Sequence, residues 1–218
     1  MTASALSRLG GWTRWQRHLA ALAALSAGIL AIFYRDALDM AGIWWHSSTF
    51  THCLLMVPMI GWLVSQRVAL LRPLTPVYWW PALAWIAGAG FVWLVGEAAG
   101  VGLFRQLGLV LMLQGAVAVA LGEKLVRGLL FPLAYALLLV PFGEELVPLL
   151  QTLTAYISMI LLHLSGLPAE LEGVFITTRA GFFEVAEACS GVNFLIAMLA
   201  YSVFAAHLCF RSWTRRIV

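Results

Sequence analysis

Charged residues are scarce in this sequence. They make up only 11% of its 218 residues, while 62% are hydrophobic. A soluble domain is usually about a quarter charged and about half apolar. This imbalance excludes an ordinary soluble domain, and the sequence has no basic patch with interleaved aromatics that would indicate nucleic-acid binding. The composition predicts an integral membrane protein, and residues 1–218 show no repeat or linker that would divide them into several domains.

Cysteines and compact catalytic motifs are also few. The three cysteines are Cys53, Cys189 and Cys209, and no CxxC pair is present, which excludes a disulfide framework and gives no sign of a zinc or redox pair. HExxH, GxSxG and Walker motifs are absent, and so is an intramembrane aspartate pair. We therefore expect no metal and no cofactor. A small transporter is disfavoured, because the apolar runs lack paired ionisable groups.

Apolar runs long enough to cross a bilayer dominate what is present. A membrane helix needs about 20 mostly apolar residues, and runs of this kind lie near 16–34, 49–66, 78–96, 103–121, 126–141 and 189–209. The first has no small-residue cleavage site after it and is interpreted as a retained span. The sequence predicts an all-α, multi-pass transmembrane helical bundle with about six spans.

The basic residues predict how these spans are oriented. With a cytoplasmic N-terminus, only Arg35, Arg105 and Arg179 lie on the outer side, and Arg105 is a candidate to pair with Glu97. The other basic residues are then cytoplasmic, as the positive-inside rule requires: Arg8, Arg14, Arg17, Arg67, Arg72, Lys124, Arg127, Arg211, Arg215 and Arg216. This orientation places Cys189 near the outer face.

Two segments before the last span look different from the rest. In this topology residues 146–165 begin and end outside, so they are expected to form an outer amphipathic helix, although their length also permits a crossing. Residues 167–188 contain "GVFITT" and "GFFEVAE", separated by the turn-forming "RAG". This pattern predicts a small β-like hairpin leading into Cys189.

Cys189 lies in the stretch "EACSGVN", where polar residues give way to the last apolar run. At the first turn of a helix, the exposed N–H groups would favour a thiolate. A thiolate attacks a carbonyl and forms an acyl-enzyme that water or an amine resolves. Two other interpretations remain: a cysteine that only packs in the membrane, and a disulfide with Cys53, which also falls near the outer side.

Candidate partners for this cysteine are few. His46 and His52 fall at the predicted depth of Cys189. Either histidine is a candidate for one of three roles: a general base, a substrate contact or an interfacial anchor. Glu187 is placed to hold a cation near the thiol, and Arg179 to bind a substrate carboxylate. These residues do not make a complete set of nucleophile, base and oxyanion donor.

Residues 181–199, "GFFEVAEACSGVNFLIAML", resemble the active-site segment of the exosortases, most closely the exosortase A type. The shared signature is Ala-Cys-Ser-Gly at the head of a membrane helix, which includes Ser190 and Gly191. Upstream, "WWHSSTFTHCLLMVPMIGWLV" is similar to an early polar and aromatic stretch of the family. Downstream, "FRSWTRRIV" resembles its cytoplasmic basic turn, so the resemblance covers nearly the whole chain.

The resemblance implies a cysteine transpeptidase or endopeptidase of the bacterial inner membrane, with Cys189 as nucleophile. Its partners would be the lipid bilayer and the C-terminal PEP-CTERM sorting tails of membrane-inserted proteins, in an exopolysaccharide-associated system. The family also uses an arginine and a histidine on later membrane segments. Because no such segment follows the basic turn here, we expect a C-terminally incomplete exosortase with little or no catalysis. The alternative is a non-enzymatic membrane component of exopolysaccharide export or assembly, in which Cys189 only packs.

Overall fold

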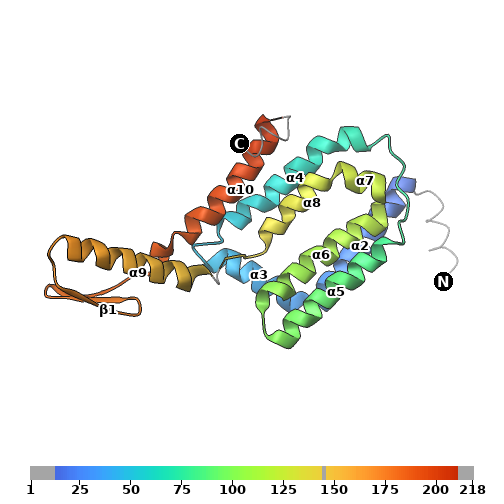
Figure 1. The fold of residues 1–218 in the computed structure, drawn as a ribbon. Helices are drawn as coiled ribbons and strands as arrows, with labels where there is room; N and C mark the ends of the chain where they lie inside the picture. Colours follow the sequence, from blue (N-terminus) through green and yellow to red (C-terminus); the bar gives the residue numbers. More distant parts are fainter. Residues whose placement is uncertain (1–12, 144–145, 211–218) are drawn as a thin grey trace. The chain divides into compact units, whose positions relative to one another are not determined.

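The computed structural model describes residues 13–143 and 146–210, and these residues form helices and one small sheet (Figure 1). The helices come first, followed late in the chain by the sheet and one more helix. In chain order the elements are α2 (Arg14–Ile32), α3 (Tyr34–His46), α4 (His52–Leu71), α5 (Ala82–Ala99), α6 (Gly102–Leu121), α7 (Glu123–Gly128), α8 (Leu130–Ala136), the 3-10 turn η2 (Leu137–Leu139), α9 (Val147–Leu164), β1 (Ala169–Glu172), β2 (Phe175–Thr178), β3 (Gly181–Glu184), the 3-10 turn η4 (Glu187–Ser190) and α10 (Val192–Cys209).

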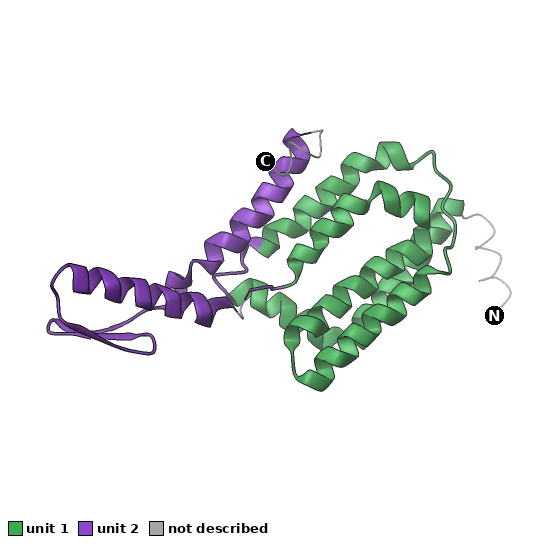
Figure 2. Ribbon diagram, viewed as in Figure 1, with its two compact units in different colours: residues 1–46, 53–140 green, residues 47–52, 141–218 purple. Residues whose placement is uncertain are grey.

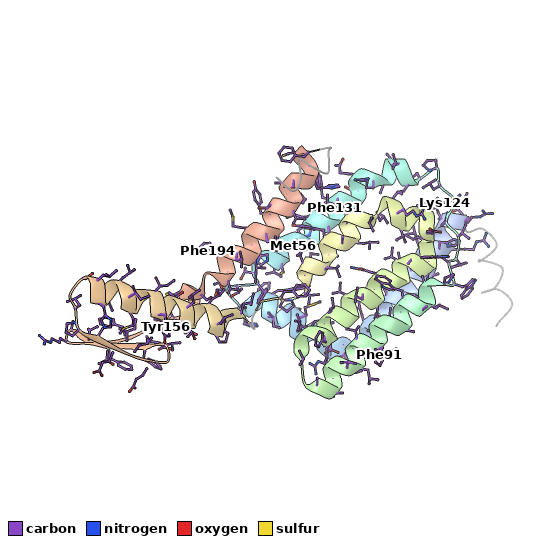
Figure 3. The ribbon with its side chains drawn as sticks, in the orientation of Figure 1. Met56, Phe91, Lys124, Phe131, Tyr156 and Phe194 are labelled. Carbon is purple, nitrogen blue, oxygen red and sulfur yellow. The ribbon has the colours of Figure 1, made fainter. Side chains whose placement is uncertain are left out.

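Six of the described helices are long and apolar enough to cross a membrane: α2, α4, α5, α6, α9 and α10. Large apolar side chains project from them, as Figure 3 shows for Phe91 on α5 and Phe194 on α10, which are 64% and 77% exposed. Lipid tails, unlike water, accept such side chains at no cost. The chain is therefore a multi-pass membrane protein, and the predicted fold class is confirmed.

The six helices are not the same six that the apolar runs predicted. Residues 126–141 do not form one span, because the chain breaks between α7 and α8. Pro132 accounts for the break: it has no N–H to donate, and its ring clashes with the carbonyl four residues earlier, at Gly128, where α7 ends. Conversely, α9 has the length and composition of a span. Its placement at the outer surface stays a prediction.

The chain divides into two compact units, coloured separately in Figure 2. The first unit contains residues 1–46 and 53–140. In it, α5 and α6 run side by side in opposite directions (Figure 1) and approach closely at three glycines, Gly96, Gly108 and Gly115. A Cβ on Gly108 would lie 2.7 Å from the Cβ of Trp93, and one on Gly115 would lie 2.5 Å from Cγ1 of Ile86. Small residues at such crossings allow membrane helices to pack tightly.

Helix α3 was not predicted, and it supplies a charged cluster to the first unit. Asp36 is buried, with Nε of Arg105 at 3.0 Å from Oδ1 and the indole Nε1 of Trp93 donating to Oδ2 at 2.8 Å. Arg105 also pairs with Glu97 at 2.9 Å and lies 3.5 Å from Asp39. The expected pairing of Arg105 with Glu97 is confirmed, and it belongs to a larger network.

The second unit contains residues 47–52 and 141–218. Its sheet is antiparallel with the order β1-β2-β3, and Ala169 pairs with Thr178. Ile176 and Val185 pack against Ala155 of α9. The two predicted β runs are confirmed as β2 and β3. Strand β1, "AELE", was missed because it has none of the β-branched or aromatic residues that signal a strand.

Candidate active site around Cys189

Cys189 was predicted to lie in the first turn of the last membrane helix, and this prediction is wrong. Cys189 belongs to the separate 3-10 turn η4, and α10 begins only at Val192. Gly191 separates the two with φ of +72°, a left-handed conformation that glycine adopts readily and that interrupts a helix. The expected stabilisation of a thiolate by the first turn of the helix therefore loses its geometric basis. The side chain of Cys189 is nevertheless exposed, and its thiol is not part of a disulfide.

Helix α9 holds the Cys189 segment in place through two side chains on one face. The hydroxyl of Thr154 lies 3.2 Å from the carbonyl oxygen of Cys189 and 2.9 Å from that of Leu150, so its single hydrogen is shared between them. Three residues earlier, Nε2 of Gln151 donates to the carbonyl of Val185 at 2.5 Å. Residues three apart lie on the same side of a helix. The end of the sheet and the cysteine turn are thus attached to the same side of α9.

Ser190 and Gly191 shape the backbone immediately after the cysteine. The hydroxyl of Ser190 accepts from the N–H of Val192 at 3.4 Å, and the N–H of Cys189 donates to Ala186 at 2.9 Å. Both predicted supporting residues are therefore next to Cys189 in a local turn. The side chain of Glu187, a third candidate, lies outside the described part of the structure.

Residues 47–52 join the second unit although they are distant from it in sequence. The hydroxyl of Thr49 donates to Oδ1 of Asn193, at the start of α10, at 2.6 Å. Nδ1 of His52 is 2.9 Å from the carbonyl oxygen of Thr49. A carbonyl only accepts, so Nδ1 carries the hydrogen and Nε2 is the basic nitrogen of the neutral ring. His46, in contrast, bonds Gly42 within α3 and belongs to the first unit.

Arg179 is not brought to Cys189. It follows β2 at the turn into β3 and lines a hollow of about 400 Å³ with His163. His163 is nine residues beyond Thr154 on α9, which corresponds to about 14 Å along the helix. A direct role beside the thiol is therefore not supported, while contact with a more distant part of a substrate stays a prediction.

The alternative disulfide is not formed. Cys53 is fully buried in the first unit, where its Sγ lies 3.9 Å from the carbonyl oxygen of Leu138. Cys189 is an exposed, free thiol in the second unit. Of these two free cysteines, Cys189 is therefore the one that is accessible for chemistry.

Four positioning residues were missed by the sequence analysis: Thr49, Gln151, Thr154 and Asn193. Each is a polar side chain within or beside an apolar run, and each makes a hydrogen bond to a part of the chain far away in sequence. Their position in or beside apolar runs was a usable signal of a structural or functional role. A polar side chain in a membrane segment costs free energy unless it makes a hydrogen bond. Their partners were not deducible, because the bonds depend on the tertiary fold.

Comparison with known protein families places this site in context. The family model described as transmembrane exosortase (Exosortase_EpsH) matches residues 44–218. No curated protein and no solved structure matches the chain. The matched range includes the 47–52 segment, α9, the sheet and the Cys189 turn. The chain belongs to the transmembrane exosortase family.

Proposed function

We propose that this protein is a membrane cysteine transpeptidase or endopeptidase whose nucleophile is Cys189. The observation that carries the proposal is the exposed thiol in a turn attached to α9, in a unit that also contains His52. Membership of the transmembrane exosortase family supports the same reaction class. An exposed thiol on a turn that is held by hydrogen bonds suits a nucleophile better than a residue that only packs.

In the proposed reaction the Cys189 sulfur attacks the carbonyl carbon of a substrate peptide bond. The C–S bond forms, the C–N bond breaks, and the leaving amine takes up a proton, which leaves a thioester on the enzyme. Water or an acceptor amine then attacks the thioester carbonyl and releases the thiol. Water makes the protein an endopeptidase, and an amine makes it a transpeptidase.

We assign His52 as the general base and Thr49 with Asn193 as positioning residues. Nδ1 of His52 donates to the Thr49 carbonyl, which fixes the ring with Nε2 as its basic nitrogen. The bond from Thr49 to Asn193 then fastens this segment to the start of α10, four residues after Cys189 in the chain. A base held in this way takes the thiol proton and returns it to the leaving amine.

The proposed substrates are proteins with a PEP-CTERM tail in the inner membrane of exopolysaccharide-producing bacteria. Such a tail combines a short Pro-Glu-Pro motif, a transmembrane helix and a basic end. The resemblance of residues 181–199 to exosortases supports this assignment. The exposed Arg179, at the end of β2, is available for a carboxylate on the substrate.

The test is to co-express the chain with a tailed reporter in a bacterium that has no exosortase of its own. Because the proposed base His52 takes the place of the later histidine that the family resemblance implies, we expect loss of the tail with the wild-type chain in place of little or no catalysis. We expect no loss with Cys189→Ala, while Cys209→Ala, the matched control at the end of α10, retains processing. A covalent complex of reporter and chain that hydroxylamine releases would identify the thioester. Processing that persists in Cys189→Ala would overturn the assignment and favour a non-enzymatic role in exopolysaccharide export or assembly.

A further inference from the structure

The first unit contains a large apolar cavity that has no part in the proposed reaction. Its volume is about 720 Å³, and its walls come from α2, α4, α6, α7 and α8. All of its lining residues are apolar except one, Arg72. Because every lining residue belongs to the first unit, the cavity is a feature of that unit alone. Its volume is within the 300–1,000 Å³ range typical of ligand sites.

The cavity has the length of one leaflet of a membrane. Along α4 its lining extends from Ile60 to Arg72, which is twelve residues or about 18 Å at 1.5 Å per residue. Half of a bilayer's hydrocarbon core is about 15 Å thick. A transmembrane helix from another protein would extend through both leaflets, whereas a lipid tail occupies only one. The length of the cavity therefore favours an acyl chain.

The walls of the cavity also suit a flexible apolar occupant. Leu22, Val64 and Leu133 line it with branched aliphatic side chains. An apolar chain fits this space without leaving a polar group unbonded.

Arg72 places a positive charge at one end of the cavity, where it would complement an anionic group on the occupant. It directly follows Leu71, the last residue of α4, so it lies where the apolar span ends. Its side chain is exposed and has no ion pair among the described residues. Lys124, labelled in Figure 3, is the second residue of α7, which packs through Leu125 against Leu71, but Lys124 does not line the cavity. A basic group such as Arg72, at the membrane boundary of a helix bundle and in the wall of the cavity, attracts an anionic lipid headgroup.

We propose that this cavity binds one acyl chain of an anionic phospholipid, whose phosphate pairs with Arg72. The apolar walls give little net preference between the cavity and the bilayer, because both surround the chain with hydrocarbon. The contact between phosphate and guanidinium therefore sets the selectivity for an anionic headgroup. The site makes the protein sensitive to the anionic lipid content of its membrane.

The experiment measures lipid retained by the purified full chain after release from nanodiscs of equimolar phosphatidylglycerol and phosphatidylcholine with identical acyl chains. Native mass spectrometry counts the lipids and identifies their class. We expect one retained lipid, with phosphatidylglycerol favoured by about fivefold. Arg72→Gln should bring that ratio close to one, whereas Lys124→Gln, at the same end but outside the cavity, should leave it unchanged.

A second pair of variants tests the cavity itself. Val64→Trp fills it and should remove the retained lipid, while Val95→Trp adds the same volume to an exposed face of α5 and should not. Ala136→Phe, from the other wall, replaces Val64→Trp if that variant fails to fold.

Three results would overturn the proposal: equal retention of both lipids by the wild type, undiminished lipid in both filled variants, or a retained second copy of the chain in place of lipid. An increase in retained lipid after deletion of residues 1–12 would also overturn it, because that segment would then be the natural occupant.

Discussion

The hydroxyl of Thr49 donates a hydrogen bond to Oδ1 of Asn193 at 2.6 Å, although the two residues are 144 positions apart. This bond attaches the short segment between α3 and α4 to the start of α10. It explains why residues 47–52 belong to the unit that contains Cys189, while the helices on either side of them in the chain belong to the other unit. The proposed base, His52, and the proposed nucleophile, Cys189, thus belong to the same compact unit, in which the Thr49–Asn193 bond joins their two chain segments.

Replacing Thr49 tests this contact. Thr49→Val keeps the shape of the side chain but removes the donor, which leaves Oδ1 of Asn193 without this partner and loosens the His52 segment. We expect tail processing to fall by about tenfold, the factor that corresponds to the ~1.4 kcal/mol typical of a lost bond with an unsatisfied partner. Thr49→Ser should keep nearly full activity. Processing is measured by immunoblot, at equal amounts of chain in the membrane, and equal activity of Thr49→Val would contradict the positioning role.

Replacing His52 tests the proposed base. His52→Gln removes the titrating nitrogen, and general-base catalysis typically contributes 10²- to 10⁴-fold, so we expect processing to drop by at least about 100-fold. His46→Gln is the matched control, because His46 also bonds a backbone carbonyl but belongs to the other unit. A similar loss in both variants would indicate that the histidines act as interfacial anchors and that neither is the base.

The apolar spans were predictable from the sequence, because a bilayer requires about 20 apolar residues whatever the tertiary fold. The details around Cys189 were not. The start of α10 was placed three residues early, because composition does not reveal that Gly191 adopts a left-handed conformation. The break between α7 and α8 was visible in Pro132, but the apolar run around it was given more weight. The bond from Thr49 to Asn193 depends on tertiary packing, which no local pattern encodes.

Thiol labelling tests the predicted orientation of the chain. Cys189 is exposed and is predicted to face outward, so a membrane-impermeant maleimide should label it in intact spheroplasts. Cys209, also exposed but at the opposite end of α10, should react only after permeabilisation, and the buried Cys53 only after denaturation. The measurement uses variants that each keep a single cysteine. Labelling of Cys209 before Cys189 would reverse the topology.

The network around Arg105 should be essential for the stability of the first unit. Arg105 contacts three carboxylates, and its partner Asp36 is 5% exposed. Arg105→Leu would leave Asp36 as an uncompensated buried charge beside Asp39 and Glu97, a change that typically costs about 3–5 kcal/mol. We expect a large fall in the thermal midpoint in detergent, followed by fluorescence-detected size exclusion. The control is Arg127→Leu, which breaks an exposed helical pair with Glu123 worth only about 0.3–0.5 kcal/mol. Similar midpoints for the two variants would show that Asp36 is neutral or solvated in the folded protein.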